Sequence, residues 1–91
     1  MLIESQMREA LFVALEPIRL DLVNESHLHA GHAGSPGTGE SHFRLLLVSP
    51  RFVGRSRVDR HRLVNEALGD LLRHKIHALA IAAYAPGESI R

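Results

Sequence analysis

The chain has 91 residues, of which 45% are apolar, and a formal net charge of +1. A chain of this length builds one compact core but not two, so we expect a single domain over residues 1–91. Its small net charge argues against attraction of the whole surface to nucleic acids and other phosphate polymers. Cysteine is absent, which excludes disulfides and thiol nucleophiles and restricts metal ligands to histidine, carboxylate or groups from another molecule.

The first predicted elements are a helix and a strand. Over residues 2–15, apolar side chains recur at the spacing of an amphipathic helix, which Pro17 ends. Over residues 18–24, apolar side chains occupy alternate positions, as in a strand with one buried face. Four of the seven glycines then fall within residues 27–40, a composition that predicts a flexible loop.

A second strand is predicted over residues 42–49. Phe43 and two leucines share one face, while Leu46 and Val48 lie on the other. Apolar residues on both faces indicate that the strand is largely covered, and we therefore expect it at the centre of the sheet.

The remaining elements are a second helix and a third strand. Ser56-Arg57-Val58-Asp59 has the spacing of a capping box, and an apolar stripe follows until the cationic residues 73–75, where the helix should end. Residues 76–84 are apolar on both faces and stop before Pro86-Gly87, which predicts a covered strand.

The predicted order is α-β-β-α-β, an α/β fold with a three-stranded mixed sheet. The helix between the second and third strands requires a parallel crossover, and the first two strands are expected to be antiparallel. His32, His42 and His77 should then converge at one end of the sheet. The arginine-rich start of the second helix should lie at the other end, roughly 20 Å away.

Four stretches resemble the BolA family in order and spacing: Glu40-Ser41-His42-Phe43, Phe52-Val53-Gly54, Arg60-His61-Arg62-Leu63-Val64 and Ile76-His77-Ala78-Leu79-Ala80. The resemblance implies a fold related to the class II KH domain, which agrees with the predicted element order. It also implies a complex with a monothiol glutaredoxin, bridged in some members by a [2Fe-2S] cluster, and in some members a role in transcription.

The same resemblance implies that His77 is a cluster ligand. From the residues alone, the alternative is a partly buried histidine bonded to a loop carbonyl. His32 lies in the segment where some family members carry a second ligand, but this segment is about one residue longer than the family pattern, so His29 is the alternative. His61 is predicted to be structural because it shares the buried stripe of its helix. The positions of His42, His74 and His27 need no metal to explain them.

A shared metal centre agrees with the missing cysteines. A [2Fe-2S] cluster needs four ligands, two imidazoles do not satisfy it, and this chain has no thiolate to add. A partner must therefore supply sulfur, and the resemblance implies that the glutaredoxin cysteine and glutathione do so. Imidazole ligation should raise the reduction potential and make the centre acid-sensitive.

Residues 51–62 contain five arginines and one aspartate, a local formal charge of +4. Arg55, Arg57, Arg60 and Arg62 are therefore candidates for contacts with DNA phosphates. Gly54-Arg55-Ser56-Arg57 occupies the place of the KH Gly-x-x-Gly clamp but lacks the second glycine. The alternative is a solvated face with ion pairs such as Asp59 to Arg62.

Other functional classes have little support. No nucleophile elbow or phosphate-binding loop is present, and a domain of this size has little room for a deep substrate pocket, so we expect no enzyme activity. No apolar run approaches the roughly 18 residues of a membrane span, and the first residues do not resemble a signal peptide. We therefore expect a cytoplasmic protein with no membrane partner.

Overall fold

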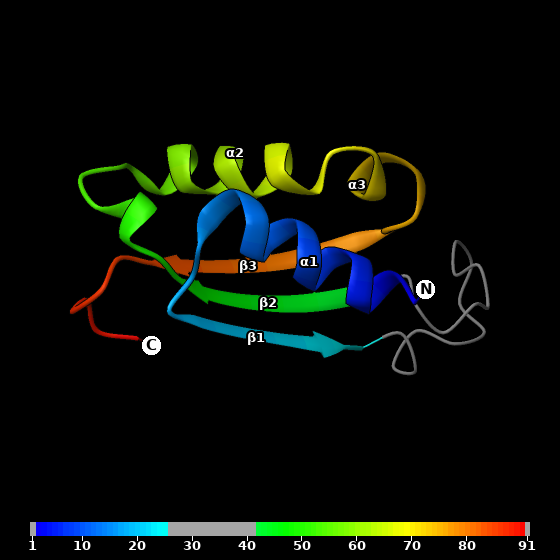
Figure 1. Ribbon diagram of the computed structural model, residues 1–91, viewed down its shortest axis with the longest axis horizontal. Helices are drawn as coiled ribbons and strands as arrows, with labels where there is room; N and C mark the ends of the chain where they lie inside the picture. Colours follow the sequence, from blue (N-terminus) through cyan, green and yellow to red (C-terminus); the bar gives the residue numbers. More distant parts are fainter. Residues whose placement is uncertain (1, 26–41, 91) are drawn as a thin grey trace.

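The computed structural model describes residues 2–25 and 42–90. The elements are α1 (Ile3–Leu15), β1 (Arg19–Asn24), β2 (His42–Val48), η2 (Pro50–Phe52), α2 (Arg57–Leu68), α3 (Asp70–His74) and β3 (Ala78–Tyr84). One sheet has the strand order β1-β2-β3, with β1 antiparallel and β3 parallel to the central β2 (Figure 1). The predicted α/β fold, the mixed sheet and the central position of the second strand are confirmed.

The core lies between one face of the sheet and the helices α1 and α2. Leu22, Leu45 and Ile81 are neighbours across the three strands, and Leu45, on the central strand, has no exposed surface. Alternate strand residues pack against the helices because side chains along a strand point to opposite faces. The other buried members of this cluster are Met7, Leu11, Leu15, Phe43, Leu47, Phe52, Val64, Leu68, Ile76 and Ala85.

The second face of the sheet differs from the prediction. The third strand was expected to be covered on both faces, but Ala78 and Ala80 are exposed, as is Arg44 beside them on β2. Both long helices pack on the opposite face, which holds Leu79 and Ile81. The alternation was hidden in the sequence because alanine is apolar yet small enough to face water without a large cost.

The helix predicted to run to residue 75 is in fact two helices. α2 ends at Leu68, Gly69 adopts a φ of 51°, and the short α3 follows. The ψ of Gly69 is −121°, a combination that residues with a Cβ avoid, so glycine allows the chain to turn at this position. The Gly69-Asp70 pair was the local sign of the break, since glycine commonly ends a helix and aspartate is common in the first turn of the next.

Two serines fix the connections on either side of η2. Ser56 Oγ accepts a hydrogen bond from the Asp59 amide at 3.1 Å, which confirms the serine half of the predicted cap. Ser49 is fully buried, and its hydroxyl donates to the Leu15 carbonyl at 2.5 Å and accepts from the Arg51 amide at 3.1 Å. The end of α1 is thereby joined to the turn after β2.

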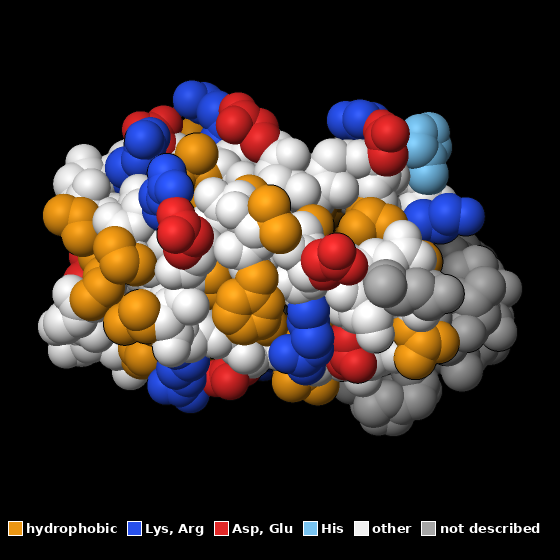
Figure 2. All heavy atoms as spheres, viewed as in Figure 1, with side chains coloured by type: hydrophobic (Ala, Val, Ile, Leu, Met, Phe, Trp, Pro, Cys, Tyr) orange, Lys and Arg blue, Asp and Glu red, His pale blue; other side chains and the backbone are white. Residues whose placement is uncertain are grey.

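The topology separates two ends of the molecule. β2 and β3 both begin at the end where α3 lies, and α2 begins at the opposite end, as predicted (Figure 1). On the face that carries α1, exposed apolar side chains are interspersed with charged groups of both signs (Figure 2). Among the helices of the described ranges, none is both long and apolar enough to cross a membrane.

Candidate functional site

Two histidines meet where β2 and β3 begin. His42 opens β2 and is paired in register with Ala78, so His77 lies directly beside it. The two imidazole rings are stacked, with centroids 5.0 Å apart and planes inclined by 11°. His42 is only 8% exposed, whereas His77 is open to solvent. A buried ring thus supports an exposed ring that a visiting molecule can reach.

The predicted convergence of histidines is confirmed for this pair. His32, its alternative His29 and the neighbouring His27 lie outside the described residues. The second metal ligand therefore stays a prediction. The sequence assigned His42 no metal-binding role, and the register of the parallel strands shows that its predicted convergence with the candidate ligand is a direct ring contact.

The donor set decides what kind of metal centre these residues fit. Within residues 2–25 and 42–90, no three histidine or carboxylate side chains are grouped closely enough to hold a metal ion, and the chain has no cysteine. An accessible imidazole such as His77 fits a centre to which it gives one ligand while other molecules give the rest. It does not fit a metal site built by the described part of the chain alone.

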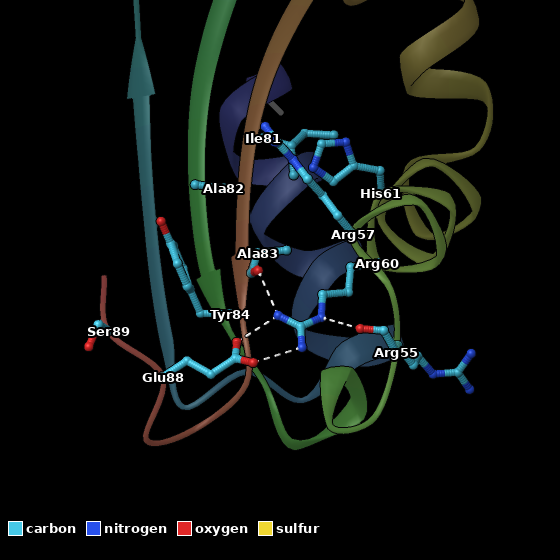
Figure 3. Close-up of a pocket in the computed structure, with 10 residues that line it drawn as sticks. All are labelled: Arg55, Arg57, Arg60, His61, Ile81, Ala82, Ala83, Tyr84, Glu88 and Ser89. Atoms are coloured by element: carbon cyan, nitrogen blue, oxygen red, sulfur yellow. Dashed lines mark hydrogen bonds and ion pairs between the residues drawn. The ribbon is translucent and has the colours of Figure 1, made fainter. Parts of the chain in front are cut away.

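At the other end of the molecule, Arg60 is held by three internal partners. It forms a two-pronged ion pair with Glu88, at 2.6 and 3.0 Å, and also donates to the Ala83 carbonyl at 3.1 Å and the Arg55 carbonyl at 3.0 Å (Figure 3). The hydrogen bonds from Arg60, followed by one from the Ala85 amide, lower the pKa of Glu88 from 4.5 to about 2. The pKa of Arg60 is raised by the same pairing.

These contacts change the predicted nucleic-acid surface. Only 12% of the Arg60 side chain is exposed and its donors are engaged within the chain, so Arg60 is a structural residue and not a free phosphate contact. Arg62 is paired with Asp59 at 3.3 Å, the ion pair that the sequence suggested as an alternative. Arg55 and Arg57 are exposed, and neither has a carboxylate partner among the described residues.

His61 also differs from its sequence-based interpretation. It was expected on the buried stripe of its helix, but it is half-buried and lines a groove beside β3 together with Arg57 and Ile81 (Figure 3). The buried positions of α2 are Val64 and Leu68. The first turn of the helix therefore faces a surface groove, and the core contacts begin one turn later.

A three-stranded mixed sheet with helices on one face and an exposed histidine before its last strand defines a small α/β domain of the BolA type. The family model for "BolA-like protein" matches residues 11–88. The chain belongs to the BolA-like protein family.

Relatives support this assignment along nearly the whole chain. A protein of Sinorhizobium sp. named from its position in the cobS 5′ region is 49% identical over 86 residues, which cover 93% of this chain and 92% of that protein. BolA-like protein 1 of Mus musculus is also 49% identical over 86 residues, covering 94% of this chain and 60% of the mouse protein. The match to SufE-like protein 1 of Arabidopsis thaliana is 46% identical and covers 24% of that protein.

Solved structures agree with the fold. BolA1 from Arabidopsis thaliana has a TM-score of 0.82 at 44% sequence identity, with 94% of each chain covered. The BolA domain of SufE1 from the same plant has a TM-score of 0.82 at 42% identity, with 93% of each chain covered. This chain is thus similar both to a separate BolA protein and to a BolA domain within a larger protein.

Proposed function

We propose that this protein is a non-catalytic regulatory partner of a monothiol glutaredoxin and that it shares a [2Fe-2S] cluster with that partner through His77. The observation that carries the proposal is the exposed His77 ring, which lies against the buried His42 ring where two parallel strands begin. His77 would give the imidazole ligand, and the glutaredoxin cysteine and glutathione would give the thiolate sulfur that this chain, which has no cysteine, cannot supply.

The described part of the chain presents one imidazole, that of His77, in a fixed orientation. The stacked His42 ring restricts the movement of the His77 ring, so less side-chain entropy is lost when a partner's metal is bound. A single imidazole at the surface can also be released by protonation, because protonated histidine cannot coordinate a metal. Both properties suit a cluster that is shared or passed on between two proteins. A second ligand from His32 or His29 stays part of the proposal.

The test is reconstitution of the hetero-complex with and without the imidazole. The purified chain and a monothiol glutaredoxin are mixed anaerobically with iron, sulfide and glutathione, and visible absorption and circular dichroism are recorded. His77→Ala should change both spectra. His74→Ala, which removes another exposed histidine at the end of α3, is the matched control and should leave them unchanged. Identical spectra for the parent and His77→Ala would show that His77 is not the ligand.

DNA binding by the arginine-rich end is the second function predicted from the sequence. The variants that test it best are at Arg55 and Arg57. Arg60 is held within the chain and Arg62 shares its charge with Asp59, so Arg55 and Arg57 are the two of the four candidate arginines that have no carboxylate partner among the described residues. Two phosphate contacts would give a slope of only about −2 in a plot of log affinity against log salt concentration. Loss of that slope in the Arg55→Ala, Arg57→Ala double variant is the expected result if DNA binds there, and unchanged affinity would exclude it.

A further inference from the structure

β3 is an edge strand whose outer side is open to another strand. The Tyr84 carbonyl accepts from the Ser49 amide at 3.0 Å, on the side of β2, whereas the Ala83 carbonyl faces away from β2 and accepts from Arg60. Because main-chain groups alternate along a strand, those of Leu79 and Ile81 point the same way as those of Ala83. In the described ranges, β3 pairs with no strand on that outer side.

A groove of about 650 Å³ runs between this edge and α2. α2 supplies Arg57 and His61, and β3 supplies residues 81–84 (Figure 3). The Arg57 side chain extends from the start of the helix toward Ile81, whereas the Arg55 side chain points outward at the groove's end. The groove thus has an apolar strand on one side and cationic groups on the other.

The charge of the groove favours an anionic occupant. Glu88 is the one carboxylate among the described residues that line it, and both of its oxygens are bonded to Arg60. The two charges of this pair therefore cancel each other. The charges of Arg55 and Arg57 are left without a carboxylate partner in the described part of the chain.

The geometry of the groove distinguishes an extended peptide from a nucleic acid. Proteins that hold single-stranded nucleic acid combine a cationic groove with aromatic side chains on which bases stack. Here the Tyr84 ring points away from α2, and among the described residues that line the groove His61 has the one other ring (Figure 3). An open strand edge beside a helix is instead the arrangement in which PDZ domains add a peptide as an extra strand. The main chain of Leu79 and Ile81 offers that pairing here.

We propose that an acidic, extended segment of a partner protein adds as a fourth strand to the outer edge of β3, with its carboxylates paired to Arg57 and Arg55. The Arg60 bond to the Ala83 carbonyl limits the pairing to the stretch before that residue. The site does not depend on the role proposed for His77, because His77 precedes β3 whereas the arginines lie at the start of α2, at the opposite end of the sheet.

The test is an NMR titration of the ¹⁵N-labelled full chain with a capped hexapeptide of alternating Val and Glu. Signals of the Leu79 and Ile81 amides should shift, because these groups would enter a new ladder. A peptide with Gln in place of Glu should bind more weakly. A peptide N-methylated at alternate residues, on the amides that face β3, should not produce these shifts, because it lacks the donors of the ladder.

Charge reversal identifies the ionic contact. Arg57→Glu should weaken binding of the Val-Glu peptide about tenfold, since it replaces an attraction by a repulsion. Arg62→Glu makes the same charge change on α2 outside the groove and should leave the affinity nearly unchanged. Three results would each overturn the proposal. They are equal effects of the Arg57→Glu and Arg62→Glu variants, equal binding of the methylated and unmethylated peptides, and no shift of the Leu79 and Ile81 amide signals at millimolar peptide. A single-stranded dT hexamer that shifts the groove signals when the peptide does not would also overturn it in favour of nucleic acid.

Discussion

The imidazole ring of His77 lies almost parallel to that of His42, with the ring centroids 5.0 Å apart. The two residues are separated by 35 positions in the chain, and the parallel pairing of β2 and β3 brings them together. His42 is buried and His77 is exposed. The inner ring therefore acts as a support that determines how the outer ring is presented.

Removing this support should weaken the shared metal centre without removing its ligand. An aromatic pair is worth about 0.5–1.5 kcal/mol, so His42→Ala should lower the yield of the reconstituted hetero-complex by up to about tenfold. His42→Phe keeps a ring against His77 and should restore most of the yield and the visible circular dichroism of the parent. If His42→Phe behaves like His42→Ala, stacking is not the reason for the effect.

The Arg60–Glu88 pair should make stability depend on acid pH. The pKa of Glu88 is lowered from 4.5 to about 2 by hydrogen bonds from Arg60 and the Ala85 amide. A carboxyl whose pKa is lower in the folded state stabilises the fold above its unfolded value and loses that effect as the pH falls through the folded value. The contribution of Glu88 should therefore be complete above about pH 4.5 and be lost toward pH 2.

Glu88→Gln tests this dependence. Denaturant unfolding at a series of pH values should show a less stable variant at pH 7 and a difference that narrows below pH 4.5. Because 43% of the Glu88 side chain is exposed, added salt should also reduce the difference. Glu9→Gln, at an exposed position of α1, is the matched control. A constant difference from pH 7 to pH 2.5 would contradict this assignment.

Ser49→Ala should destabilise the protein strongly for so small a change. The substitution leaves the Leu15 carbonyl and the Arg51 amide without the hydroxyl that now bonds both. A buried polar group left without its partner costs about 1–3 kcal/mol, and we expect a loss in this range in the free energy of unfolding. Ser5→Ala, at an exposed site on α1, should change stability by less than about 0.5 kcal/mol. Equal effects of the two substitutions would argue against the buried bridge.

Gly69→Ala should be destabilising because of its backbone conformation. Gly69 has φ 51° and ψ −121°, a region that residues with a Cβ avoid. An added Cβ would meet its nearest atom, the Glu66 carbonyl oxygen, at an ordinary 3.8 Å, so the cost comes from the dihedral angles and not from a clash. We expect a loss of about 1–3 kcal/mol in thermal or denaturant unfolding. Asn65→Ala, at an exposed position of α2, is the comparison, and a neutral Gly69→Ala would contradict the expectation.

Local patterns were enough to predict most elements. The helical spacing over residues 2–15, the alternation over residues 18–24 and the serine before α2 correspond to α1, β1 and an observed cap. The same patterns failed where the hydropathy of a residue does not match its burial in the structure, and where one residue interrupts a helical pattern. Alanines on the open face of β3 look buried in a hydropathy pattern, and Gly69 lay inside an otherwise continuous helical stripe.

The amino-acid sequence by itself determined the order of the elements, the absence of thiol ligands and the likeness to the BolA family, because these depend on residue type and on spacing along the chain. Only the tertiary structure decided that His42 supports His77 and that Glu88 engages Arg60, 28 positions away. The physical reason is that the first contact depends on the register of β2 and β3, and the second on the path that the chain takes after β3. Neither leaves a periodic pattern in the sequence.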